Sequence, residues 1–444
     1  MPKAQHAKPK ATAQQTAKSQ PKKKSPSEDK KQHKDSKQKP APVVNEHEKK
    51  KQTFIVRTIW TLVMIVGMFS IISAGPLWTI AFVILLQIMV FKECIAITSK
   101  GAQNEDLQHS SYLNWYFLAT TLFYLEGRSL IKYTFAFLLG SSYTPSLALK
   151  LLIHHKFICY CLYVLGFVGF VALLRTNSLK AQFTQLCITH MLLIFVISQG
   201  YCIVNNIMHG MFWFLFPAGL VITNDIFAYL CGITFGKTQL ISISPKKTVE
   251  GFVGAWVCTT IMSILLTYII SNSYYFICPV NGNLSVNCLS GITCDPNPVF
   301  IEQIFTLPVD LAKLLGRDYI YLKPIYLHSM VLATFASLFA PFGGFFASGL
   351  KRAVKVKDFG DTIPGHGGVA DRMDCQFLMG SFSYLYYEAF ISTDQFNVGN
   401  LLQTIVINLS VEEILVLVTS LLNYLYKMGA IDEDVHNKII ELLI

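Results

Sequence analysis

Long apolar runs constrain the fold of this chain more than any other feature. The runs occupy residues 58–74, 77–97, 157–174, 183–204, 211–233, 252–273 and 326–347. Several of them approach or exceed the roughly 18 apolar residues that indicate a membrane-spanning helix. They are continuous rather than alternating, which favours helices over a membrane β-barrel. The sequence therefore predicts an all-α, polytopic membrane protein with about 7–10 transmembrane helices.

The charge content supports the same class. Only 14% of the 444 residues are charged, whereas a soluble domain carries about 25%. The first 52 residues hold much of the net charge of +10 and have almost no aliphatic side chains. Such a segment buries too little apolar surface to offset its ordering entropy, so we expect a disordered, basic N-terminal tail at 1–52.

The tail admits two interpretations. It is either a solvated arm without a function of its own, or a segment attracted to the anionic cytoplasmic leaflet of a membrane. Because basic residues flank the cytosolic ends of spans, the tail should lie in the cytosol. The tail lacks aromatic platforms, and membrane spans follow it at once, so nucleic-acid binding is a poor interpretation. The N-terminus is polar before any apolar run, so no secretory signal peptide is expected.

Three segments leave the number of crossings open. Residues 112–140 form either one interrupted helix or two short ones, and it is unclear whether 376–391 or 403–426 cross. If 112–140 cross once, the polar stretches 236–251 and 348–374 lie on the side of the basic tail. We prefer this arrangement because it places the lysine-rich loops in the cytosol.

The expected division of the chain follows from these runs. After the tail come N-terminal transmembrane helices at 53–221, a catalytic transmembrane domain at 222–391 and a C-terminal helical segment at 392–444. The loop 274–324 should face the lumen. It contains Cys278, Cys288, Cys294 and an N-x-S glycosylation pattern at Asn283. The sequence leaves open whether any of these cysteines form a disulfide.

A first polar cluster spans residues 222–254. Asn224 and Asp225 lie in an otherwise apolar run, where a satisfied polar pair between helices is the simpler interpretation. Ser244 or Thr248 can cap the helix that follows. The first turn of that helix would present N–H groups beside Lys246 and Lys247, which is a site for phosphate.

A second cluster, Ser348–Asp374, follows the last of the long runs. Lys351 and Lys355 would share one face of a helix, although snorkelling at the membrane interface accounts for some of these cations. Asp371 and Asp374 are three residues apart, so on a helix they lie on one face and can hold a cation. Carboxylates beside lysine and arginine suit Mg²⁺ bound together with substrate phosphates.

The same stretch resembles a known family. The run S-x-L-K-R-x4-K-D-x-G-x2-I-P-x-H-G-G-V-x-D-R-M-D, from Ser348 to Asp374, is similar to the signature of the phosphatidate cytidylyltransferases, or CDP-diacylglycerol synthases. N-D-I-x-A-Y-x-x-G from Asn224 and S-P-K-K-T-x-E-G from Ser244 also resemble this family, specifically its eukaryotic, endoplasmic-reticulum branch. The resemblance covers roughly residues 110–390.

The resemblance implies a reaction and a set of roles. CTP and phosphatidate would give CDP-diacylglycerol and pyrophosphate for phospholipid biosynthesis, with Mg²⁺ as cofactor. The protein would be a multi-pass protein of the endoplasmic-reticulum membrane, with its active site facing the cytosol. Expected catalytic residues are Lys351, Arg352, Asp358, His366, Asp371 and Asp374. Expected substrate-binding residues are Ser244, Lys246, Lys247, Thr248, Glu250, Lys351, Arg352, Gly367, Gly368 and Arg372. Expected metal ligands are Asp371, Asp374, Asp225 and Asp358.

Two other functions are weighed against this one. A CTP-dependent lipid kinase of the dolichol-kinase type would transfer the γ-phosphate, but the full length of the match at 348–374 argues against it. An anion transporter would scatter charges along several spans, whereas here the charges cluster at span ends. Acyl-chain preference, the number of metals and the exact number of crossings stay open, as does a homodimer.

Overall fold

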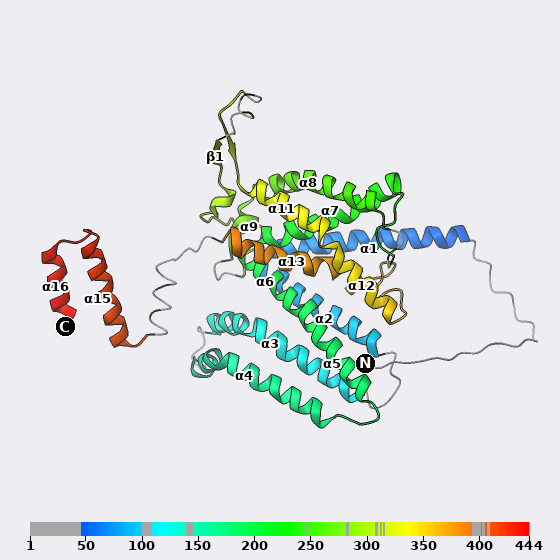
Figure 1. Ribbon diagram of the computed structural model, residues 1–444, viewed down its shortest axis with the longest axis horizontal. Helices are drawn as coiled ribbons and strands as arrows, with labels where there is room; N and C mark the ends of the chain where they lie inside the picture. Colours follow the sequence, from blue (N-terminus) through cyan, green and yellow to red (C-terminus); the bar gives the residue numbers. More distant parts are fainter. Residues whose placement is uncertain are drawn as a thin grey trace, which may run out of the picture. The chain divides into compact units, whose positions relative to one another are not determined.

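The computed structural model describes most of the chain beyond the basic tail (Figure 1). The described residues are 46–99, 108–138, 145–242, 244, 247–280, 284–306, 310, 313, 316–392, 401, 405 and 409–443. Helices dominate them, as the sequence predicts. Among the described residues, seven helical stretches are long and apolar enough to cross a membrane. They are Phe54–Ala74, Pro76–Thr98, Lys150–Ala172, Leu179–His209, Met211–Phe235, Val249–Ile270 and Ile325–Ala353.

A helical hairpin opens the described chain. Helix α1 (Glu46–Ala74) begins inside the segment expected as a tail, and α2 (Pro76–Ser99) follows after a single residue. That residue, Gly75, has a φ of +119°, and an added Cβ would lie 2.1 Å from the carbonyl oxygen of Val286. Only glycine combines this conformation with so close an approach. The hairpin turn therefore contacts the loop that follows α8 (Val249–Ile270).

The next helices form a layer beside α2. They are α3 (Gln108–Leu138), α4 (Pro145–Ala172), α5 (Leu179–Leu192) and α6 (Gln199–His209). One π-helical segment, η2 (Leu193–Ser198), joins α5 to α6, so this stretch continues as one long helix. Helix α3 is continuous through the segment whose crossing number was open, but it is not one of the seven described stretches that are long and apolar enough to cross. The single crossing stays a prediction.

The second half of the bundle is built around α13. Helices α7 (Met211–Phe235) and α8 pack against α11 (Ile325–Leu338), and α12 (Pro341–Ala353) continues from α11 after a break. Helix α13 (Ala370–Phe390) contacts α2, α6, α7 and α12. Trp213, Phe216, Leu332 and Met379 are among the buried side chains of this core. The helix in this region therefore starts earlier than the apolar run expected at 376–391, and it includes Asp371 and Asp374.

The region after α8 is the part that departs from an all-helical pattern. It holds the short helices α9 (Tyr274–Ile277) and η3 (Pro298–Phe300) and an antiparallel pair, β1 (Gln303–Thr306) and β2 (Tyr319–Leu322). A disulfide joins Cys278 to Cys294, whereas Cys288 is an exposed thiol. Asn283 of the glycosylation pattern lies outside the described residues.

Contacts of the α1–α2 hairpin show which loops share an end of the bundle. At its turn, the amide of Leu77 donates to Leu284, and the amide of Cys288 donates to Ser73. At its other end, Arg57 donates to the carbonyl of Gly365. The loop at 271–324 and the stretch at 348–374 therefore lie at opposite ends of this hairpin, as the predicted order of crossings requires.

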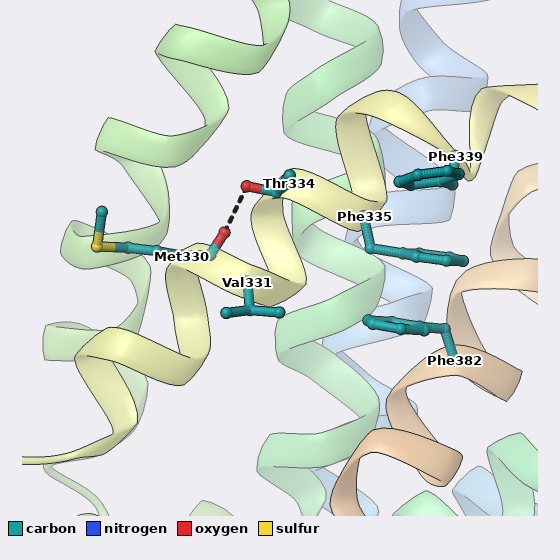
Figure 2. A pocket seen from close by; sticks show the side chains of 6 residues that line it. All are labelled: Met330, Val331, Thr334, Phe335, Phe339 and Phe382. Atoms are coloured by element: carbon teal, nitrogen blue, oxygen red, sulfur yellow. Dashed lines mark hydrogen bonds between the residues drawn. The ribbon is translucent and has the colours of Figure 1, made fainter. Parts of the chain in front are cut away.

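An apolar groove follows α11 on the outside of the bundle (Figure 2). Its lining consists of Met330, Val331, Thr334, Phe335, Phe339 and Phe382. The rings of Phe335 and Phe382 stack with their centroids 3.7 Å apart, which joins α11 to α13. The side-chain hydroxyl of Thr334 donates to the carbonyl of Met330, so the polar atom is satisfied within the helix. Such a surface suits contact with hydrocarbon.

The C-terminal segment contains two amphipathic helices. Helix α15 (Val411–Lys427) begins with a capping box formed by Ser410 and Glu413, and α16 (Glu433–Leu443) packs against it. His436 of α16 bonds Asn423 of α15. No residue of α15 is buried.

The disulfide makes a direct prediction about the eleven cysteines. Alkylation of the unfolded, unreduced protein should label nine of them, because Cys278 and Cys294 are joined. Reduction before alkylation should raise the number to eleven, as measured by mass spectrometry of proteolytic peptides. Cys288 is the internal control, since it should react in both samples. Complete labelling without reductant would contradict the pairing.

Candidate active site

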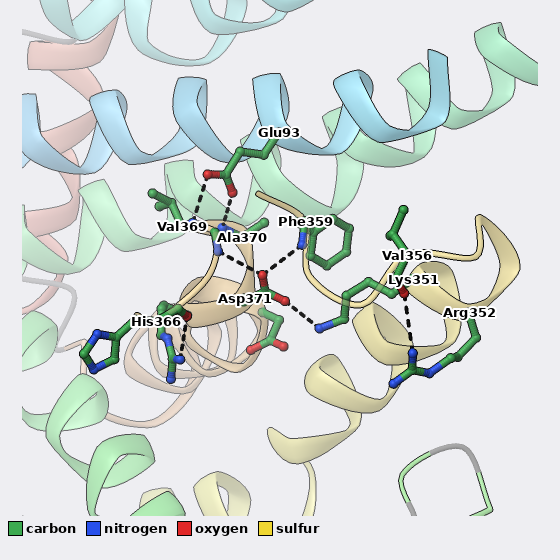
Figure 3. Close-up of polar contacts among 12 residues, drawn as sticks. Glu93, Lys351, Arg352, Val356, Phe359, His366, Val369, Ala370 and Asp371 are labelled. Atoms are coloured by element: carbon green, nitrogen blue, oxygen red, sulfur yellow. Dashed lines mark hydrogen bonds and ion pairs between the residues drawn. The ribbon is translucent and has the colours of Figure 1, made fainter. Parts of the chain in front are cut away.

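An ion pair connects α12 to α13 at the centre of the second polar cluster (Figure 3). The Nζ of Lys351 lies 2.5 Å from Oδ1 of Asp371, and both side chains are largely buried. The other carboxylate oxygen of Asp371 accepts from the backbone amides of Phe359, at 2.9 Å, and Gly368, at 3.1 Å. Asp371 therefore links Lys351 on α12 to the backbone of Phe359 and Gly368, which lie in the segment between α12 and α13.

The histidine-glycine segment forms a tight turn before α13. The amide of Ile363 donates to the carbonyl of Gly367, and the amide of His366 donates to Ile363. Gly365 and Gly367 have φ values of +76° and +85°, which side chains with a Cβ rarely adopt. These two glycines are thus required by the turn itself, and His366 between them is half-buried.

Arg372 holds this turn from the first turn of α13. Its Nη2 donates to the carbonyl of His366 at 2.7 Å. The guanidinium is otherwise exposed. Arg372 therefore has a backbone partner in the turn.

Asp374 lies where α12 and α13 touch most closely. A Cβ on Gly343 would come 2.4 Å from the Asp374 carbonyl oxygen, and one on Gly344 would come 3.4 Å from Oδ2. Burial raises the pKa of the Asp374 carboxyl, while hydrogen bonds from Cys375 and the charges of Lys351 and Lys247 act in the opposite direction. A cation at this carboxylate would favour its charged form.

The first polar cluster folds into a closed loop before α8. Thr248 is the N-cap, and its hydroxyl accepts from the amide of Gly251, as one of the two expected caps. The carboxylate of Glu250 accepts from the amides of Lys237 and Thr238. The side chain of Glu250 therefore binds the backbone of Lys237 and Thr238, at the start of the segment that joins α7 to α8.

The two polar clusters meet between α7, α12 and α13. The Nζ of Lys247 lies 4.6 Å from the centre of the Phe345 ring on α12. Asp225 on α7 is within electrostatic range of Lys247, Asp374 and Arg372. Residues from three helices and one loop thus face one another, although about 150 residues separate Asp225 from Asp374 in the sequence.

The remaining predicted residues lie around this centre. Arg352 is exposed, and its Nη1 is 3.5 Å from the carbonyl of Val356. Asp358 is exposed next to Gly367. Ser244 is half-buried and does not cap α8, while Lys246 lies outside the described residues.

The expectation that Lys351 and Lys355 share a helical face is wrong. Helix α12 ends at Ala353, where the amides of Lys355 and Val356 turn back to the carbonyls of Arg352 and Lys351. Lys355 has a φ of +57°, the left-handed conformation that commonly ends a helix. Lys355 therefore lies beyond the end of α12 and does not share a helical face with Lys351.

Sequence reasoning missed the partners that α1 and α2 supply. Arg57 donates to Gly365, and Thr61 bonds Nε2 of His366 at 3.2 Å. Glu93 on α2 accepts from the backbone amides of Val369 and Ala370 (Figure 3). The signal for Glu93 was available, because an acidic residue inside an apolar run marks a functional position. Nothing in the sequence pairs it with residues so distant.

Two carboxylates near Lys247 could hold a metal ion. Among the described residues, no group of three or more His, Cys, Asp or Glu side chains is placed to hold one. Mg²⁺ does not need such a group, because it is commonly bound by one or two carboxylates together with substrate phosphates. The oxygen donors of Asp225 and Asp374, beside Lys247, fit that mode.

Comparison with known proteins agrees with this site. Residues 55–390 match the cytidylyltransferase family. Phosphatidate cytidylyltransferase of Saccharomyces cerevisiae is 50% identical over 415 residues, which cover 92% of this chain and 90% of that protein.

Two further relatives extend the similarity. A putative phosphatidate cytidylyltransferase of Schizosaccharomyces pombe is 47% identical over 86% of each chain. Human phosphatidate cytidylyltransferase 2 is 41% identical over 76% of this chain and 74% of its own. The matched residues include the whole of both polar clusters. This chain therefore belongs to the cytidylyltransferase family, and within it to the phosphatidate cytidylyltransferases, or CDP-diacylglycerol synthases.

Proposed function

We propose that this chain transfers CMP from CTP to phosphatidate, which gives CDP-diacylglycerol and pyrophosphate. The observation that carries this proposal is that Lys247 and Asp374 converge on the same part of α12: Lys247 lies over the ring of Phe345, and the neighbouring Gly344 closely approaches the Asp374 carboxylate. Carboxylates for a cation and cations for phosphate are the groups that nucleotidyl transfer needs. The family membership of the chain supports the same reaction.

The lipid phosphate is a sufficient nucleophile in this reaction. Its second pKa is about 6, so it is largely a dianion at neutral pH. One of its oxygens attacks the α-phosphorus of CTP, and the bond from that phosphorus to the oxygen bridging to the β-phosphorus breaks. Pyrophosphate leaves with the electron pair, so the chain has no proton to remove and forms no covalent intermediate. The task of the protein is to position two anions and offset their charge.

Several cationic residues are available to position the two anionic substrates and offset their charge. Lys247 and Arg352 are exposed and can bind the triphosphate or the lipid phosphate. Lys351 lies beside them and is held in place by Asp371. Gly367 and Gly368 let the backbone approach a phosphate closely, and His366 and Arg372 border the same turn.

We assign the Mg²⁺ ion to Asp225 and Asp374. Bound there, it would offset the negative charge of the phosphates and the charge that develops in the reaction. Asp371 was also expected as a ligand, but its oxygens already accept from Lys351 and from two backbone amides. We therefore propose that Asp371 positions Lys351, and that Asp358 and Glu250 support the surrounding loops.

We place the chain in the endoplasmic-reticulum membrane with the site facing the cytosol. Cationic residues gather at the end of the bundle that carries the site, as the positive-inside rule favours. The disulfide lies in the loop at the other end, where an oxidising lumen would preserve it. A homodimer stays a prediction.

The position of a radiolabel tests the reaction directly. Purified protein in detergent, given phosphatidate and Mg²⁺, should move label from α-phosphate-labelled CTP into the lipid. Label at the γ-phosphate should appear in pyrophosphate, because the bond that breaks lies between the α- and β-phosphates. Lipid labelled from the γ-phosphate would contradict the proposal and indicate a kinase.

Asp225→Asn and Asp374→Asn test the cation site. Each should lower kcat at fixed Mg²⁺ by at least about 100-fold, because a neutral amide holds a divalent cation far less well. Each should also raise the Mg²⁺ concentration that gives half-maximal activity. Asp318→Asn, in the loop at the opposite end, is the matched control and should leave both quantities unchanged. A Mg²⁺ dependence like that of the wild type would remove the residue from the site.

Lys351→Met tests the ion pair with Asp371. The change removes a cation from the site and leaves a largely buried carboxylate without its charged partner, which typically costs about 3–5 kcal/mol. We expect both a lower thermal midpoint in detergent and a loss of CMP transfer. Lys323→Met at the opposite end of the bundle should affect neither. Undiminished CMP transfer by Lys351→Met would show that the site does not need this cation.

A further inference from the structure

Glu93 is a buried acid that the reaction, as described above, does not use. It lies on α2 with only 8% of its surface exposed, in a helix that is otherwise almost entirely apolar. Its two oxygens accept from the amide of Val369 at 3.1 Å, the amide of Ala370 at 2.9 Å, and the hydroxyl of Thr362. All three donors belong to the segment that carries the candidate active site.

Two of these donors, the amides of Val369 and Ala370, are ones that α13 leaves unsatisfied. The first backbone amides of a helix have no partner within it, and they carry partial positive charge. Helix α13 has Val369 at its N-cap, which offers no side-chain acceptor. Glu93 therefore caps α13 from a different helix, and it supplies the negative charge that a helix start favours.

Two glycines shape the loop around this carboxylate. A Cβ on Gly368 would come 2.5 Å from Oε2 of Glu93, and one on Gly360 would come 3.1 Å from Oε1. Any larger side chain at Gly368 would push the loop away from Glu93. The approach of the loop to Glu93 thus explains glycines that a phosphate contact alone would not require.

We infer that Glu93 is a positioning residue for the reaction: it fixes the first turn of α13, and through it Lys351, Asp371 and Asp374. Ala370 lies directly before Asp371, whose carboxylate in turn holds Lys351. Misplacing reacting groups by about 1 Å costs on the order of 100-fold in rate. This inference rests on the proposed function, since the groups it positions are those that would bind CTP, phosphatidate and Mg²⁺.

The test compares Glu93→Gln with a matched change on the same helix. Glu93→Gln keeps the shape but loses the charge and one acceptor. Gln87→Leu alters another buried polar side chain of α2, six residues away, that packs against Gly200 rather than the site. For each variant, kcat for CMP transfer, KM for CTP, the thermal midpoint in detergent and hydrogen exchange of the amides at 359–371 are measured.

We expect Glu93→Gln to lower kcat by about 10–100-fold with a much smaller change in KM for CTP. The amides of Val369 and Ala370 should exchange faster, and Glu93→Asp, which keeps the charge, should retain more activity than Glu93→Gln. Gln87→Leu should keep the kcat of the wild type even if its thermal midpoint falls.

Three outcomes would overturn the inference. One is a wild-type kcat for Glu93→Gln, and another is unchanged exchange at Val369 and Ala370. The third is a loss of kcat that follows the thermal midpoint equally in Glu93→Gln and Gln87→Leu, because that would indicate a purely structural role. If the wild-type protein itself transfers no CMP, the proposed function fails instead, while the exchange measurement still reports on the Glu93 contact.

Discussion

The backbone amides at the start of α13 must find acceptors, and the candidate site depends on how they do so. One carboxylate comes from Asp371 within the helix, and a second comes from Glu93 on α2. Because both bind the same short segment, the helix start, the preceding turn and Lys351 form one unit. Helices α2, α6, α7 and α12 pack against α13 and hold this unit at one end of the bundle.

The residues of the candidate site could be predicted from the sequence better than the residues that hold them in position. The shared face of Asp371 and Asp374 follows from their spacing once the helix is known, although the apolar run indicated a helix only from residue 376. The residue types narrowed the cap of α8 to Ser244 or Thr248, and the structure has Thr248. Glu93, Arg57 and Thr61 could not be paired with their partners, because each contact joins residues about 270–310 positions apart. Lys355 was misplaced for a local reason, since hydrogen bonds that end α12 outweigh the helical continuation suggested by its neighbours.

The two ends of the bundle differ in chemistry, and this difference suits a reaction between a lipid and a nucleotide. The apolar sides of the helices, including the groove of Figure 2, match the hydrocarbon in which a lipid tail resides. The charged clusters lie together at one end, away from the apolar sides of the helices. The protein can thus bring together phosphatidate, which resides in the membrane, and CTP, which is dissolved in water.

The contact of Glu93 with Val369 and Ala370 has a consequence for synthesis of the chain. Translation adds about 5–20 residues each second, so on the order of 15–55 s pass between Glu93 and its partners. During that interval an acidic side chain sits near the end of a membrane helix without the helix start that later binds it. The nascent bundle must tolerate a carboxylate without its later donors, and the site is complete only when Glu93 accepts hydrogen bonds from the start of α13.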